Sequence, residues 1–317
     1  MALRTLLVEV PFTQFDVPSL EVSISLWELS WPCHRAPLVP SRPDLVFAFN
    51  GNISDPSHAG SRARVLALMR RPVVSDCFGS IRLESAYLFG SDDTYDKRRL
   101  NANWTVGPNN LFFKFLYRAA AKGYRFMAQL EPDIVPLRPL WVEELNSLAA
   151  SSEAWVVGSP FLSLCAHNMQ TSQCSGLGLS IKFHINGNAL YAVGDPQFRA
   201  YWRRAFGGEL RLWPFDLALH KYTTRMPEML QRRLATKFRA SPHLLNFGGE
   251  VLPEGAVVPE LKSSIPDAFL LHSSWAMSLI RKGRKSAAGL EPTNRCGRID
   301  ARRVLPECLS TPGLHRT

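Results

Sequence analysis

Hydrophobic residues in the first 140 positions form short continuous runs that alternate with amphipathic segments. Continuous runs are typical of buried strands, and amphipathic segments are typical of helices. The expected strands cover residues 5–12, 44–50, 80–88 and 124–131. The expected helices cover residues 18–29, 58–71 and 109–123. Strands and helices that alternate at this spacing predict an α/β fold with a mainly parallel central sheet, flanked by helices on both faces.

The pattern changes after residue 140 and predicts a second, smaller lobe. The expected elements there are helices at 140–150, 196–206 and 214–236, strands at 154–158, 184–193 and 267–274, and an irregular stretch at 159–182. We therefore predict one domain over residues 1–276, with lobes at 1–140 and 141–276, followed by a basic tail at 277–317.

The composition supports a folded chain that prefers anionic partners. Its 317 residues are 46% hydrophobic, which is enough to fill a large core, and its formal net charge is +10. A positive excess favours nucleic acid, membrane surfaces or phosphorylated small molecules. The basic residues after Arg281 lack interleaved aromatic residues, and no nucleic-acid-binding motif is present. We therefore expect no nucleic-acid partner.

The N-terminal apolar run is broken by Glu9 and Pro11, and no segment of the chain reaches membrane-spanning length. We therefore expect a soluble chain without a signal peptide or transmembrane segment, unless an anchor is missing from this sequence. The six cysteines form no C-x-x-C pair, which argues against a structural zinc site. In an oxidising compartment, Cys165 could pair with Cys174, and Cys296 with Cys308.

Two carboxylates, Glu131 and Asp133, directly follow the apolar run at 124–131. In parallel sheets ligands gather at the carboxyl ends of strands, and paired carboxylates offer hard oxygen ligands to Mn²⁺ or Mg²⁺. Pro132 fixes the backbone between the two side chains, and Pro136 and Pro139 predict an open loop after them. The alternative is that the pair only caps a helix or solvates a loop.

The segment FMAQLEPDIVPLRPLW, residues 126–141, resembles the Glu-x-Asp variant of the Asp-x-Asp motif of sugar-nucleotide enzymes. In element order, residues 1–275 resemble a glycosyltransferase of the GT-A fold. The resemblance implies a nucleotide-sugar donor, with UDP favoured, and a Mn²⁺ or Mg²⁺ ion. It makes Asp133 a ligand of the ion that bridges the donor diphosphate, and it places Glu131 on the ribose or the ion. His272, at a strand end, would complete the metal shell.

The same resemblance assigns the first lobe to the nucleotide sugar. Phe12 and Thr13, at the end of the first strand, and Asp16 would lie against the nucleoside. Turn chemistry alone also explains Thr13. Asn109 and Asn110 open the helix at 109–123 and could offer amides to phosphate or sugar, or merely cap that helix.

The second lobe would face the sugar and a glycan or other hydroxyl acceptor. Three residues of the strand at 184–193, Asn186, Gly187 and Asn188, are similar to the Asn-x-Gly stretch of many GT-A enzymes. Polar residues and a glycine inside a strand indicate a bulge or a close backbone approach to a ligand, and the alternative is a hairpin corner without a ligand. Asp216 is the candidate catalytic carboxylate, and His220 shares its helix face. Helix N-capping is the simpler explanation of Asp216.

Three function classes therefore remain open. The first is a metal-dependent glycosyltransferase, in the cytoplasm or, if an anchor is missing, in the Golgi lumen, and the order of its motifs favours a retaining outcome. The second is a non-catalytic basic protein that binds glycans or nucleic acid on a similar scaffold. The third is a nucleotidyltransferase, but the first strand is not followed by the glycine-rich loop such enzymes use for phosphate. The oligomeric state is not predicted.

Overall fold

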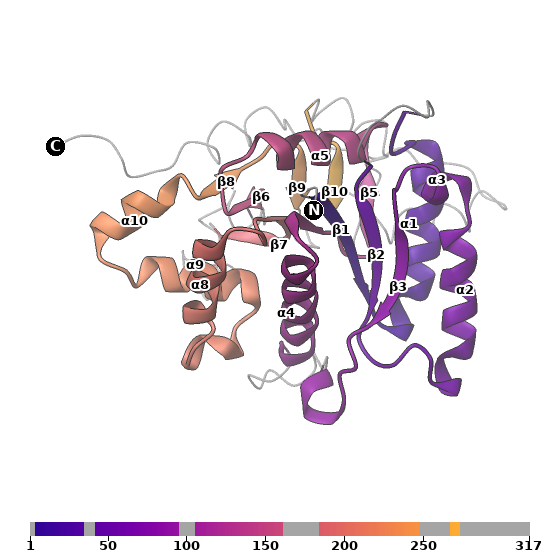
Figure 1. Cartoon of the computed structure of the whole chain (residues 1–317), viewed down its shortest axis with the longest axis horizontal. Helices are drawn as coiled ribbons and strands as arrows, with labels where there is room; N and C mark the ends of the chain where they lie inside the picture. Colours follow the sequence, from indigo (N-terminus) through magenta and orange to yellow (C-terminus); the bar gives the residue numbers. More distant parts are fainter. Residues whose placement is uncertain (1–3, 35–41, 95–104, 161–183, 247–266, 273–317) are drawn as a thin grey trace, which may run out of the picture.

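The central sheet has seven strands in the order β3-β2-β1-β4-β7-β6-β8 (Figure 1). The computed structural model describes residues 4–34, 42–94, 105–160, 184–246 and 267–272. The strands are β1 (Arg4–Phe12), β2 (Asp44–Phe49), β3 (Ile81–Ser85), β4 (Tyr124–Gln129), β6 (Val156–Pro160), β7 (Ile185–Tyr191) and β8 (Phe238–Ala240). Strands β1 to β4 are parallel, and β7 runs antiparallel to both β4 and β6. The sheet is therefore mainly parallel, as predicted.

Helices cover both faces of this sheet. They are α1 (Val17–Leu29), α2 (Ala59–Met69), α3 (Pro72–Ser75), α4 (Val106–Ala121), α5 (Trp141–Ser151), α8 (Pro196–Ala205), α9 (Phe215–Thr224) and α10 (Glu228–Ala235). Helices α4 and α5 both pack against β1 and β4, and α9 packs against β7. Trp27 of α1 contacts Trp141 of α5 with ring centroids 4.9 Å apart. The predicted α/β layering is confirmed, and the sheet continues across residue 140.

A second sheet combines three short strands from the middle and the later part of the chain. It consists of β5 (Ile134–Pro136), β10 (Leu270–His272) and β9 (Leu244–Asn246), in the order β5-β10-β9. Strand β10 is antiparallel to β5 and parallel to β9. The open loop expected after Asp133 is therefore wrong, because residues 134–136 form a strand that pairs with a segment far along the chain.

Most predicted elements exist, with shifted ends. The helix predicted at 214–236 is wrong as a single element, because Pro227 lies between α9 and α10 and has no backbone N–H to continue the first helix. The strand predicted at 267–274 is shorter within the described residues. The irregular stretch at 159–182 falls almost wholly outside them, as does the basic tail at 277–317.

A disulfide joins Cys33, which follows α1, to Cys77, which follows α3. Both cysteines are buried in the hydrophobic core, near α1. The sequence did not predict this pairing. The predicted pairs Cys165–Cys174 and Cys296–Cys308 lie outside the described residues.

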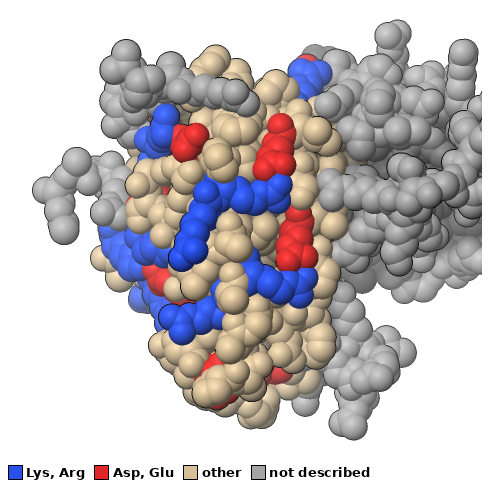
Figure 2. All heavy atoms as spheres, turned by 90° about the vertical axis from the view of Figure 1, so that its right-hand side faces the viewer, with Lys and Arg blue, Asp and Glu red and all other residues tan. Residues whose placement is uncertain are grey.

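The face formed around α2 carries charges of both signs side by side (Figure 2). Arg64 on α2 pairs with Glu21 on α1 at 2.6 Å, and Arg71 pairs with Glu28 at 2.5 Å. Exposed pairs of this kind contribute about 1 kcal/mol or less each. Here they tie α2 and α3 to α1. No helix in the described ranges is long and apolar enough to cross a membrane.

Candidate functional site

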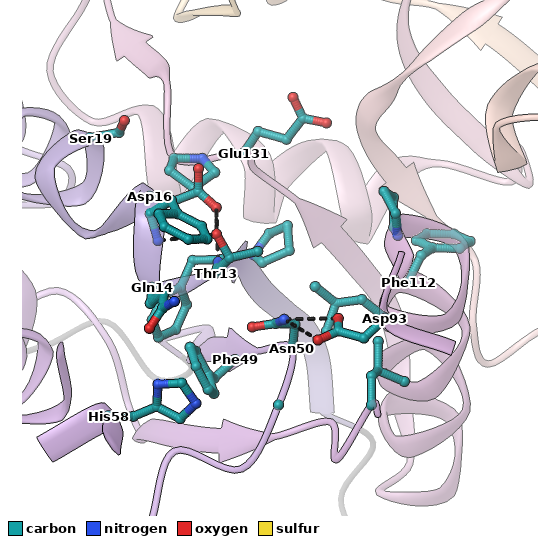
Figure 3. A pocket seen from close by; sticks show the side chains of 18 of the residues that line it. Thr13, Gln14, Asp16, Ser19, Phe49, Asn50, His58, Asp93, Phe112 and Glu131 are labelled. Atoms are coloured by element: carbon teal, nitrogen blue, oxygen red, sulfur yellow. Dashed lines mark hydrogen bonds between the residues drawn. The ribbon is translucent and has the colours of Figure 1, made fainter. Parts of the chain in front are cut away.

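A cavity of about 720 Å³ opens where β1, β2, β3 and β4 end (Figure 3). Phe12 and Thr13 line it from the end of β1, Phe49 and Asn50 from the end of β2, and Glu131 from the end of β4. Side chains at the start of α4 and after β3 complete the walls. This is the edge of a parallel sheet at which ligands are expected.

Three potential metal ligands converge at one side of this cavity. Nε2 of His272 lies 2.7 Å from Oε2 of Glu131 and 3.1 Å from Oδ1 of Asp133. One ligand atom from each residue falls within 4.8 Å of the other two. Two carboxylates and one imidazole form a donor set that fits Mn²⁺, and three protein ligands leave positions open for substrate oxygens. The structure therefore brings together the three residues predicted as metal ligands.

The short second sheet brings His272 to the carboxylates. In the β5–β10 pairing His272 is opposite Ile134, which directly follows Asp133. The pairing of β10 with β9 places His272 opposite Asn246, and Nδ1 of His272 donates a hydrogen bond to Oδ1 of Asn246. This contact leaves Nε2 facing the carboxylates. Metal-binding histidines commonly donate their other ring N–H to such a partner, which fixes the orientation of the ring.

Glu131 and Asp133 control the protonation of His272. Burial lowers the pKa of His272, but Glu131 and Asp133 raise it more strongly, to about 10. The two carboxylates thus attract positive charge to the point where the three side chains meet. A cation at this point must displace the His272 proton.

We predict that the stability of the metal-free protein falls between about pH 6.5 and about pH 10. Because the folded pKa of His272 is raised above 6.5, its proton stabilises the fold fully below pH 6.5, and this contribution is lost as pH rises through about 10. Thermal unfolding of EDTA-treated wild type should approach that of His272→Ala across this range. Parallel unfolding curves for the two proteins would contradict the prediction. The apparent Mn²⁺ affinity of wild type should rise over the same range.

Asn188 in β7 supports the main chain of the metal site. Its Oδ1 accepts a hydrogen bond from the Glu131 backbone N–H at 2.7 Å, and its Nδ2 donates to Oδ1 of Asn186 at 3.1 Å. Asn188 is buried, so both amide groups are used inside the protein. The two asparagines, predicted to face the sugar, therefore hold Glu131 in place, and direct contact with a sugar stays a prediction.

We expect Asn188→Ala to weaken Mn²⁺ binding by about tenfold, since loss of an outer-shell partner typically costs metal sites that much. Asn186→Ala removes only the two bonds that Oδ1 of Asn186 accepts from the backbone N–H and Nδ2 of Asn188, so its effect should be smaller. A Mn²⁺ titration of the three proteins measures this order. Equal affinity in wild type and Asn188→Ala would show that Asn188 does not position Glu131.

Asp216, the candidate catalytic carboxylate, forms a buried polar cluster with β7. It lies 3.2 Å from Nε2 of His184 and accepts hydrogen bonds from the backbone N–H of Gly187 at 3.1 Å and Leu217 at 2.8 Å. Burial, followed by His184, lowers the pKa of His220 to about 4. His220 is therefore neutral near pH 7. Neither Asp216 nor His220 lines the cavity, and their roles in catalysis and sugar binding stay predictions.

Gly187 is required by packing against α9. A Cβ at this position would lie 2.9 Å from Cζ of Phe215, whose ring stacks on Phe112 with centroids 3.8 Å apart. The pairing of β7 with β6 shifts register across this glycine, between Ile185 and Ala189, so the irregularity predicted for this stretch is present. Within the described residues, the close approach expected at Gly187 is made by Phe215, and an approach by a ligand stays a prediction.

The residues predicted to bind the donor divide into two groups. Phe12 and Thr13 line the cavity, and the Thr13 hydroxyl donates to Asp16 at 2.8 Å while its oxygen accepts from the Phe15 N–H at 3.3 Å. Asn109 instead joins α4 to the chain before α9, donating to the carbonyl of Trp213 at 2.8 Å and accepting from the N–H of Phe215. It does not line the cavity, so a donor contact by Asn109 stays a prediction.

Asn50, Asp93 and His58 are among the polar residues of the cavity that sequence reasoning missed. Nδ2 of Asn50 donates to both oxygens of Asp93 at 2.8 and 2.9 Å, and His58 packs edge-on against Phe49 at 4.9 Å (Figure 3). Burial raises the pKa of Asp93, and the bond from Asn50 opposes this. Oδ1 of Asn50 and Nδ1 of His58 have no hydrogen-bond partner among the described residues. Asn50 could have been found, since it ends the second expected strand.

Several solved glycosyltransferases are similar to this chain over most of its length. Mouse xyloside xylosyltransferase 1 shares 11% identity, covering 84% of this chain and 96% of its own, with a TM-score of 0.47. The galactosyltransferase LgtC, in complex with donor and acceptor sugar analogs, shares 11% identity. The match covers 90% of this chain and 97% of LgtC, with a TM-score of 0.43. The bifunctional glycosyltransferase WbbM shares 12% identity. The match covers 85% of this chain and 45% of WbbM, with a TM-score of 0.45.

No protein-family model matches the sequence, and no curated protein matches it significantly. The similarity to these structures concerns the fold. The functional assignment therefore rests on the geometry of the cavity and of the three converging ligands.

Proposed function

We propose that the chain is a metal-dependent glycosyltransferase that moves a sugar from a nucleoside-diphosphate sugar, with UDP as the expected nucleotide, to a glycan or other hydroxyl acceptor. The observation that carries the proposal is the convergence of Glu131, Asp133 and His272 on one side of the cavity. A cavity of about 720 Å³ matches the size of small-molecule sites.

The residues present fit Mn²⁺ or Mg²⁺. Asp133 and Glu131 offer hard oxygen atoms, and His272 offers Nε2 because its Nδ1 is bound to Asn246. When bound, the ion supplies positive charge that stabilises the diphosphate as a leaving group. The chain's own task is to hold these ligands in place, and the bond from Glu131 N–H to Asn188 does part of this work.

The rest of the cavity would bind and orient the donor. Phe12, Phe49 and Phe112 provide apolar surface, while Asn50 and Asp93 provide polar groups at the end of β2 and after β3. Fixing the donor in this way converts the transfer into a reaction between groups already in position. A retaining outcome remains our expectation from the order of the motifs, with Asp216 as the candidate catalytic carboxylate.

A nucleotide-sugar panel with and without Mn²⁺ tests the proposal. We expect release of nucleoside diphosphate from at least one donor, dependent on Mn²⁺ and abolished by EDTA. Release of pyrophosphate from nucleotide and sugar phosphate would instead identify a nucleotidyltransferase. If no donor is turned over and none binds in the presence of Mn²⁺, the enzyme assignment fails and the non-catalytic binding class is favoured.

A further inference from the structure

A glutamate lies in the buried middle of strand β1, at the centre of the sheet. Glu9 interrupts the apolar sequence of β1, and its side chain is 0% exposed. Neither of its carboxyl oxygens has a hydrogen-bond partner among the described residues. A buried charge without a partner is too costly to persist in a folded protein, so this carboxyl needs either a proton or a partner that accounts for it.

The strand register places one polar neighbour beside Glu9. Val46 of β2 is opposite it on one side, and Gln129 of β4 is opposite it on the other. Paired residues in neighbouring strands point to the same face of the sheet. Gln129 is 4% exposed, and its Oε1 is also buried without a partner in the described chain. Two unsatisfied oxygen-bearing groups therefore stand next to each other in the sheet.

In the part of the chain that the structure describes, no cation acts on Glu9. Tyr191 of β7 lies on the same face, but its hydroxyl already donates to the Gly187 carbonyl at 2.8 Å. The helices over this face contribute the stacked rings of Phe112 and Phe215. Burial raises the pKa of Glu9 well above its ordinary value, and no charged group offsets this effect. Because the carboxyl is fully buried and neither oxygen has a partner among the described residues, its neutral form is favoured, and that form has one proton to donate.

We propose that Glu9 is a positioning residue of the donor site, whose neutral carboxyl group donates a hydrogen bond to Oε1 of Gln129. This bond would fix the Gln129 amide with its nitrogen directed toward the cavity that Gln129 lines. Nε2 of Gln129 lies 3.6 Å from the position that a Cβ on Gly187 would occupy, and Glu131 follows two residues later.

The ligand group that fits this amide is an oxygen acceptor. Because Gln129 adjoins the metal site, the acceptor is an oxygen of the donor's diphosphate or of its sugar. This part of the inference rests on the proposed function. The proposed Glu9–Gln129 hydrogen bond does not rest on that function, because it can be tested in the protein without a ligand.

Carbon-13 NMR of glutamate side-chain carboxyls tests the protonation of Glu9 without any donor. The Glu9 resonance is the one that disappears in Glu9→Gln. We expect it at the position of a neutral carboxyl, unchanged from about pH 6 to about pH 8, whereas exposed glutamates are ionised throughout. A Glu9 resonance at the carboxylate position would overturn the proposal, since an ionised Glu9 requires the Gln129 amide to be turned the other way.

Variants of Glu9 test its effect on the cavity. Glu9→Met keeps the length and removes the donor, so we expect UDP with Mn²⁺, or the UDP-sugar, to bind about tenfold more weakly. Glu9→Gln restores an N–H donor and should bind within about twofold of wild type. Val8→Ala is the matched control, because Val8 is 0% exposed in the same strand but points to the opposite face. It should lower thermal stability without changing ligand affinity.

The pattern of losses identifies the acceptor oxygen. Weaker binding of both UDP and the UDP-sugar in Glu9→Met assigns the contact to the diphosphate, and weaker binding of the UDP-sugar alone assigns it to the sugar. Unchanged affinity for both ligands in Glu9→Met would overturn the positioning role. If wild type binds neither ligand, the proposed function fails, whereas the NMR experiment still decides whether Glu9 is neutral.

Discussion

Asp133→Asn is expected to abolish sugar transfer, with a loss of at least about a thousandfold, because metal ions of this kind contribute several kcal/mol to catalysis. Asparagine keeps the size of the side chain but removes the charge that faces Nε2 of His272 at 3.1 Å. We expect the fold to tolerate the loss of this charge. The Asp133 side chain is 24% exposed, and His272 keeps Glu131 as a partner.

Two measurements separate loss of the metal from loss of the fold. The melting temperature of Asp133→Asn should stay within about 3 °C of wild type, while the Mn²⁺ concentration needed for binding rises sharply. Glu144→Gln makes the same chemical change on α5, away from the cavity, and should keep full activity. Retained transfer in Asp133→Asn, or gross unfolding, would argue against a metal role for Asp133.

Removing the Cys33–Cys77 disulfide is expected to cost about 4 kcal/mol of unfolding free energy, because the bond closes a loop of intermediate length. The two residues are 44 positions apart, and the bond ties the end of α1 to α3. Chemical denaturation of the double variant Cys33→Ala, Cys77→Ala measures the loss. Catalysis should be largely retained, since neither cysteine lines the cavity.

Reducing agent provides the control for this experiment. Wild type in reducing agent should lose stability toward that of the double variant, and the double variant should not respond. Because such bonds persist in oxidising compartments, protein made in a reducing cytosol should show the lower stability. Equal stability of wild type and variant, or free thiols at both positions in oxidised protein, would contradict the prediction.

The sequence was sufficient to predict the first four strands of the sheet. The runs of β1, β2 and β4 are largely apolar because these parallel strands are buried on both faces, whereas the edge strand β3 is only partly buried and alternates with charged residues. The short strands β5, β8 and β9 were not predicted. Three residues give too little periodicity, and β5 exists only because β10, far along the chain, pairs with it. The break at Pro227 was missed because the helical pattern continues on both sides of it.

The metal ligands could be predicted by residue type but not by geometry. Glu131 and Asp133 follow a recognisable strand, whereas the placement of His272 depends on its pairing opposite Ile134. The support of Glu131 by Asn188 could not be foreseen, since it joins β4 to β7 across a long separation in sequence. Glu9 was visible as a charge in an apolar run, but only the register with Gln129 gives it a role.

A crystal structure of the protein with Mn²⁺ and UDP tests the central claim most directly. We predict anomalous density for manganese between Oε2 of Glu131, Oδ1 of Asp133 and Nε2 of His272, with diphosphate oxygens completing its coordination and the nucleoside in the cavity at the ends of β1 and β2. An ion bound elsewhere, or no ion at these three atoms while UDP occupies the cavity, would contradict the assignment of a metal-dependent glycosyltransferase.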